Sequence, residues 1–118
     1  MNLVCLKGRP KGSYVYIGRG GPLGNPFSHL PPGSTRAQVQ VLTVEDAVSA
    51  CDDWARGNNG ALPKAAKCIP PAQRTRFLAA VDALHEDDVL GCYCQAGTPC
   101  HGLVIMRLWA ERKRCAHE

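Results

Sequence analysis

Four glycines and two prolines fall between residues 18 and 26, and this stretch constrains the fold more than any other part of the chain. Glycine and proline at such density do not support a regular helix or strand, so Gly18–Pro26 is predicted to be a shaped loop. Two short stretches before it, Asn2–Leu6 and Tyr14–Ile17, are apolar, aromatic or β-branched, which is typical of strands. The chain is therefore expected to begin with short strands that lead into an irregular loop.

Apolar residues at helical spacing predict two helices in the middle of the chain. The first begins at Thr43, a good N-cap, and stops before Gly57. The second begins at Pro70–Pro71, because proline suits the first turn of a helix, and it ends within 85–88. Between the two helices, the pattern of Leu62–Ile69 does not decide between helix and loop.

The last part of the chain is predicted to be a strand over Val89–Cys94 and a helix that begins at Thr98–Pro99. The charged end, 111–118, is expected to fray. Strands that alternate with helices in this order favour an α/β fold. We predict a single α/β domain over 1–118, with a three- to four-stranded, largely parallel sheet flanked by about three helices.

Both unusual loops of the chain, Gly18–Phe27 and Cys92–Gly102, follow predicted strands. The carboxyl ends of parallel strands meet at one edge of a sheet, and ligands bind beyond that edge. The two loops are therefore predicted to form one site.

The glycine loop has the composition of a phosphate-binding segment. Gly18, Gly20 and Gly24 let the backbone approach a ligand, and successive amides in such a loop can hold an anion. Arg19 adds a planar guanidinium suited to phosphate or carboxylate, and Asn25 offers both a donor and an acceptor. The loop has neither a Walker A nor a Rossmann pattern, so a structural turn with a solvated Arg19 is the alternative interpretation.

Three of the seven cysteines fall within nine residues, and this segment is open to three interpretations. It could bind Zn²⁺ or an iron–sulfur cluster through four soft or borderline ligands, Cys92, Cys94, Cys100 and His101. Alternatively, Cys94 or Cys100 is a catalytic or redox-active thiol paired with His101, because a thiol in the first turn of a helix has a lowered pKa. In the third interpretation Cys92 and Cys94 pack in the core, and the helix N-terminus binds a ligand phosphate. Cys5 could join any of these clusters, and the sequence does not decide the role of His29.

The net charge of +4 permits contact with nucleic acid or phosphate without requiring it. Four basic residues lie on the last helix, where a solvated face accounts for them without a ligand: Arg107, Arg112, Lys113 and Arg114. No apolar run is long enough to span a membrane, and no signal peptide is evident, so we expect a cytoplasmic protein with reduced cysteines.

In both loops the chain resembles a small family of phage and bacterial proteins, domain of unknown function 4326. The matching segments are Val15–Arg19, Gly24–Phe27, Cys92–Cys94 and Pro99–Gly102. The resemblance covers nearly the whole chain. It implies a stand-alone domain, encoded by a phage or a bacterium, with its site in these two loops, and it implies no particular activity. Leu103–Val104 stand where many relatives carry an acidic residue, so that acidic contribution is not expected here.

Together these patterns favour a domain that binds a nucleotide or phosphosugar, and they leave open whether it is an enzyme. Arg19 and the glycine backbone would hold the phosphate, and Asn25 would orient the sugar or base. Cys94, Cys100 and His101 would face the reactive end. The rival hypothesis is a binding module for nucleic acid or a host protein, stabilised by zinc or an iron–sulfur cluster.

Overall fold

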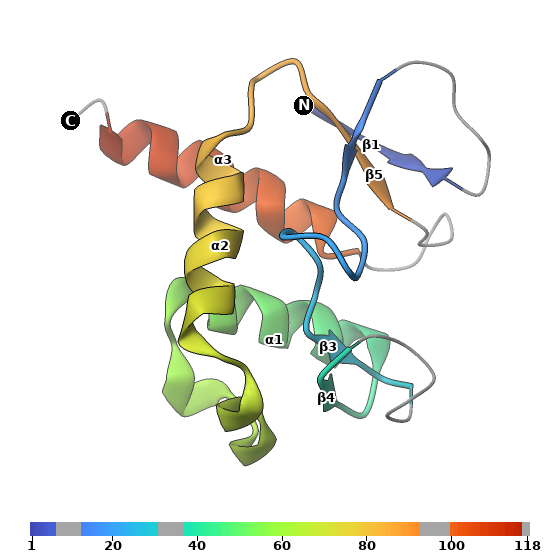
Figure 1. Ribbon diagram of the computed structural model, residues 1–118, viewed down its shortest axis with the longest axis vertical. Helices are drawn as coiled ribbons and strands as arrows, with labels where there is room; N and C mark the ends of the chain where they lie inside the picture. Colours follow the sequence, from blue (N-terminus) through green and yellow to red (C-terminus); the bar gives the residue numbers. More distant parts are fainter. Residues whose placement is uncertain (7–12, 31–36, 93–99, 117–118) are drawn as a thin grey trace.

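The computed structural model of the protein describes residues 1–6, 13–30, 37–92 and 100–116. Figure 1 shows a small sheet at one end of the molecule and helices α1, α2 and α3 packed beside and below it. The elements follow in the order β1, β2, β3, β4, α1, two 3₁₀ turns, α2, β5 and α3. The predicted α/β class, with parallel strands and three helices, is confirmed.

A three-stranded sheet is built from β1 (Asn2–Cys5), β5 (Val89–Cys92) and β2 (Val15–Tyr16), in the spatial order β1-β5-β2. Both pairings are parallel, as predicted, and the last strand of the chain is the central one. The carboxyl ends of all three strands therefore lie at the same edge. At that edge the pairing extends past β2, because the amide of Ile17 donates to the carbonyl of Gly91 at 3.0 Å.

One face of this sheet is covered by helix α3 (Gly102–Ala116). Leu3 and Leu90 are register partners, so their side chains share a face, and Leu90 is completely buried. Gly102 begins the helix directly against these residues: a Cβ at Gly102 would lie 2.5 Å from Leu3 Cδ1 and 3.1 Å from Ile17 Cδ1. The start of α3 therefore packs so closely on the sheet that only glycine, which has no side chain, fits at position 102.

Two shorter strands, β3 (Phe27–Ser28) and β4 (Val39–Gln40), form a separate parallel pair. The carbonyl of Pro26 accepts bonds from the amides of Gln38 and Val39, at 2.9 and 3.0 Å. Phe27 and Val39 are buried in the core. Two residues are too few for side-chain alternation to be visible in a sequence, which is why this pair was not predicted.

Helix α1 (Val44–Arg56) has the predicted boundaries. The Thr43 hydroxyl accepts a hydrogen bond from the Asp46 amide at 3.0 Å, and Gly57 ends the helix with a φ of 77°. A left-handed residue at this position is a common helix ending that favours glycine. The buried face of α1 consists of Ala47, Ala50, Cys51, Trp54 and Ala55.

Helix α2 (Pro71–Asp82) begins as predicted but ends before the expected 85–88. Residues His85 and Asp88 instead close a turn, in which the Asp88 carboxylate accepts from the His85 amide at 2.8 Å. Between α1 and α2 the chain makes two 3₁₀ turns, η2 (Asn59–Ala61) and η3 (Lys64–Cys68), in the segment whose pattern was undecided.

Helices α1 and α2 contact each other through an aromatic pair and a polar cap. The rings of Trp54 and Phe77 pack edge to face with their centroids 5.1 Å apart. Arg74 Nε donates to the carbonyl oxygens of Trp54 at 3.0 Å and of the following residue at 3.1 Å. Because the last carbonyls of a helix have no partner within the helix, Arg74 completes the carboxyl end of α1.

Ion pairs join the end of α3 to the other two helices. The helix continues through Ala116, and the fraying expected for 111–118 stays a prediction. Glu111 accepts from Arg56 Nη1 of α1 at 2.6 Å, and Arg112 makes two bonds, 2.6 and 2.7 Å, to the carboxylate of Asp82 at the end of α2. In the described parts of the chain, no helix is long and apolar enough to cross a lipid bilayer.

The glycine at the end of α1 gives a test of this packing. Gly57→Ala should lower the free energy of unfolding by about 1–2 kcal/mol, because alanine is strained in the left-handed region. A Cβ there would also lie 3.1 Å from Arg74 Nη2. Gly60→Ala is the matched control, since a Cβ at Gly60 meets nothing within 4 Å. Urea unfolding of both variants measures the difference, and equal stabilities would contradict the assignment.

Candidate functional site

The two predicted loops meet through the side chain of His101, at the edge of the sheet where the strands end. His101 Nε2 lies 2.8 Å from the carbonyl oxygen of Ile17 and 3.0 Å from that of Leu23. A carbonyl oxygen can only accept, so Nε2 carries the proton and the neutral ring has its lone pair on Nδ1. One imidazole therefore joins the start of α3 to two points of the glycine loop, the residue that precedes it and Leu23 within it. The described parts of the two loops are thus in contact, while their role as one binding site stays a prediction. We call this arrangement the joined loops: Ile17–Phe27 with Cys100–Gly102.

The His101 ring is buried, with 7% of its surface exposed. Burial lowers the pKa of His101 below its ordinary value of 6.5, because the charged ring would lose its hydration. The two carbonyl oxygens act in the opposite direction, and the positive charge of Arg19 lowers the pKa further. The residue is thus a neutral hydrogen-bond donor, whose ring is engaged in holding the loop.

Arg19 lies along the glycine loop rather than pointing freely into solvent. Its Nε donates to the carbonyl of Asn25 at 3.2 Å, and Nη2 donates to the carbonyl of Phe27 at 2.8 Å. Arg19 is half-exposed, so its side chain is partly solvated while it makes these two bonds to the loop. Arg19 clamps the second half of the loop and keeps a permanent positive charge beside His101.

Asn25 is buried, and its amide is used inside the protein. Nδ2 donates to the carbonyl of Ala47 on α1 at 3.1 Å, and Oδ1 accepts from the amide of Phe27 at 2.9 Å. These bonds join the loop to the helix and hold a tight turn, which is a typical use of asparagine in loops. The side chain of Asn25 therefore has a structural role in the loop, and the orientation of a ligand by Asn25 stays a prediction.

The backbone of the glycine loop folds into two successive turns. The amide of Gly21 donates to Gly18 and that of Gly24 to Gly21, at 3.3 and 3.2 Å. Gly20 has a φ of 92°, which L-residues rarely adopt. Gly24 packs so closely on the start of the loop that a Cβ would lie 2.9 Å from the Gly18 carbonyl. The amides of Gly21 and Gly24 are therefore already hydrogen-bonded within the loop. An anion at this loop would have to bind to other donors.

Two of the predicted cysteines lie side by side. Cys92 Sγ and Cys100 Sγ are 3.5 Å apart, and both side chains are buried. Cys5 is the register partner of Cys92 on β1 and is half-buried, so it lies on the same face of the sheet. Cys94, which we had placed among the catalytic and metal-binding candidates, lies outside the described residues.

Cys100 precedes helix α3 instead of lying in its first turn. The helix begins at Gly102, whose amide lies 3.4 Å from Cys100 Sγ, and the Leu103 amide donates to the Cys100 carbonyl at 3.2 Å. The thiol still contacts a donor at the helix N-terminus. The predicted helix start, Thr98–Pro99, lies outside the described residues.

The contacts of His101 restrict how it could serve as one of the four predicted metal ligands. Because Nε2 of His101 is bonded to two carbonyls, a metal ion could reach only the other nitrogen. Among the described residues, no group of three or more His, Cys, Asp or Glu side chains is placed to hold a metal ion. Cys51 is fully buried in α1, and burial raises the pKa of its thiol to about 12, so it is an unreactive core residue.

Other candidates lie outside the joined loops. His29 is exposed, and Arg112 is paired with Asp82. Sequence reasoning missed Tyr16, whose hydroxyl donates to the Arg19 carbonyl at 2.9 Å and whose ring covers Gly18. An aromatic residue two positions before a glycine is the signal that would have indicated this cover.

The chain belongs to the family described as domain of unknown function 4326, whose sequence model matches residues 6–111. This span includes both of the joined loops, and it confirms the resemblance drawn from the two motifs. No curated protein is significantly similar to the chain. No solved structure is significantly similar to it either.

The lowered pKa of His101 predicts a dependence of stability on pH. Below pH 6.5 the unfolded chain takes up a proton that the folded chain resists, so the free energy of unfolding should fall as the pH falls from 6.5 towards 5. The slope should approach but not exceed about 1.4 kcal/mol per pH unit for one proton.

Chemical unfolding at a series of pH values measures this slope. His101→Gln should remove it, whereas His85→Gln, on an exposed turn, should retain it. An unchanged slope in His101→Gln would show that another group causes the dependence.

Proposed function

We propose that the protein binds a phosphate-bearing ligand of the nucleotide or phosphosugar type at the joined loops. The observation that carries the proposal is the contact of His101 with Ile17 and Leu23, at 2.8 and 3.0 Å. This contact brings the loops after two parallel strands together at the carboxyl edge of the sheet. Open α/β sheets bind their ligands at that edge.

Charge at the joined loops supports an anionic ligand. Arg19 is half-exposed, and its guanidinium is positive at every pH of interest. The N-terminus of the fifteen-residue helix α3 adds the positive end of its dipole at the same place. His101 contributes no charge, because its pKa is lowered, but it fixes the loop that carries Arg19. Binding would therefore rest on one guanidinium and the helix end, with Asn25 and the glycine turns holding their positions.

A ligand panel tests the proposal directly. Inorganic phosphate, ribose 5-phosphate, AMP, ATP and NAD⁺ are titrated into ¹⁵N-labelled protein. We expect at least one to give saturable shifts in the amides of residues 18–24 and 101–104, with a Kd between about 1 µM and 1 mM. Arg19→Lys keeps the charge but loses the planar fork, so it should weaken binding by about tenfold.

Arg76→Lys on the exposed face of α2 is the matched control and should leave the affinity unchanged. Because Arg19 also holds the loop, the spectrum of Arg19→Lys must first show that the loop is intact. Shifts absent across the panel up to about 5 mM would refute the proposal, whatever the variants do.

A metal-stabilised binding module is a second candidate, supported by the two adjacent thiols. Two thiolates on one tetrahedral Zn²⁺ are separated by roughly 3.8 Å, given bonds of about 2.3 Å. Cys92 and Cys100, at 3.5 Å, are close to this separation. They would supply two ligands, and the ion would hold the end of β5 to the start of α3 for a partner such as nucleic acid or a host protein.

Metal analysis of protein purified anaerobically without chelator tests this candidate. About one zinc or one iron–sulfur chromophore per chain is expected if it holds, and Cys100→Ser should lose it. Cys68→Ser, at an exposed cysteine of η3, is the matched control. Metal-free protein with titratable thiols would exclude the candidate.

A further inference from the structure

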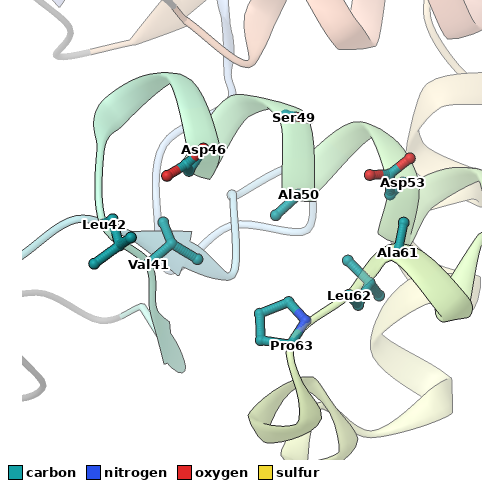
Figure 2. Close-up of a pocket in the computed structure, with 9 residues that line it drawn as sticks. All are labelled: Val41, Leu42, Asp46, Ser49, Ala50, Asp53, Ala61, Leu62 and Pro63. Carbon is teal, nitrogen blue, oxygen red and sulfur yellow. The ribbon is translucent and has the colours of Figure 1, made fainter.

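A pocket of about 440 Å³ lies on α1, and none of the residues that line it belongs to the joined loops (Figure 2). It is a groove open to solvent, since five of its nine lining residues are exposed, and a ligand in it would lie along the surface. The pocket is formed by one side of α1, the segment that leads into it from β4, and residues 61–63, from the last residue of η2 onward. Its apolar lining consists of Val41, Leu42, Ala50, Ala61, Leu62 and Pro63.

The polar lining of the pocket is arranged along one side of α1. It consists of Asp46, Ser49 and Asp53. The two carboxylates are seven residues apart, which is almost two full turns, so they share a face and are separated by about 10 Å along the helix axis. Figure 2 shows them at opposite ends of the pocket, with Asp46 beside Leu42 and Asp53 beside Ala61.

The charge of this pocket is opposite to that of the chain. The chain carries a net charge of +4, yet the described residues that line the pocket include two carboxylates and no Lys, Arg or His. Asp53 Oδ1 accepts a hydrogen bond from Asn58 Nδ2 at 3.2 Å, which orients the carboxylate. Leu42, at the other end, is 91% exposed and offers apolar surface beside Asp46. A cation with an apolar body would complement this arrangement, and an anion would be repelled.

We propose that this pocket binds a linear aliphatic diammonium ligand, the chemistry of the polyamines. The methylene chain would lie over Ala50, Leu62 and Pro63, and one ammonium group would pair with each carboxylate. A separation of about 10 Å corresponds to roughly eight extended bonds between the terminal nitrogens. Ser49 lies between Asp46 and Asp53 along α1, and its hydroxyl is a further polar group of the lining that could accept a bond from a secondary amine.

Spermidine, putrescine and neutral octanediol are the probes for this proposal. In a titration of ¹⁵N-labelled protein at low salt, spermidine should shift amides in 41–53 and 61–63 saturably. Putrescine, which is too short to span both carboxylates, should bind more weakly, and octanediol should bind weakest. Asp46→Asn/Asp53→Asn keeps the side-chain shapes but removes both charges, and the Kd for spermidine should rise about fivefold or more.

Glu86→Gln/Asp87→Asn is the matched control, because it removes two exposed carboxylates from a turn that does not line the pocket. Its Kd for spermidine should equal that of the unmodified protein. If the Asp double variant does not fold, Ser49→Trp fills the pocket from an exposed position and should abolish the shifts.

Three outcomes would overturn the proposal. Equal weakening by both double variants would reveal a general charge effect. Octanediol shifts as large as those of spermidine would indicate an apolar site without cation recognition. Spermidine shifts that persist in Ser49→Trp would place the binding elsewhere.

Discussion

The hydrogen bonds from His101 to Ile17 and Leu23 are the constraint on which the geometry of the joined loops depends. Both carbonyls belong to buried residues, and a buried carbonyl without a donor costs free energy comparable to a lost hydrogen bond. The donor comes from a residue 84 positions from one carbonyl and 78 from the other. One neutral side chain thus satisfies two buried acceptors and fixes the distance between the end of β2 and the start of α3.

Local sequence patterns predicted the helices and the α/β class well, because their determinants are neighbours along the chain. Thr43 caps the N-terminus of α1 and Gly57 ends the helix, through hydrogen bonds and backbone geometry that involve only a few neighbouring residues. The ion pairs at the end of α3 were not predicted, for the opposite reason. Glu111 and Arg112 form a charged, apparently solvated tail in the sequence, and only the arrangement of the three helices brings Arg56 and Asp82 to them.

The contact between the two loops could be predicted from the sequence. The hydrogen-bond partners of the residues in those loops could not. Glycine, arginine and asparagine in one loop are equally compatible with binding a ligand and with satisfying their own backbone. Asn25 bonds to Ala47, which is 22 residues away, and no local pattern identifies that acceptor. In this loop the arginine and asparagine side chains satisfy backbone groups of the protein itself, through bonds that only the folded chain brings together.

The central place of β5 also determines when the fold can form. The strands β1 and β2 lie on opposite sides of β5, and Asn2 pairs with Val89. A chain emerging from the ribosome therefore holds two edge strands without their shared partner until most of its length has been made. Contacts of such large sequence separation slow folding, and unpaired strands are exposed to association with other chains during the delay. The first quarter of this protein therefore completes its sheet only after the last quarter has been made.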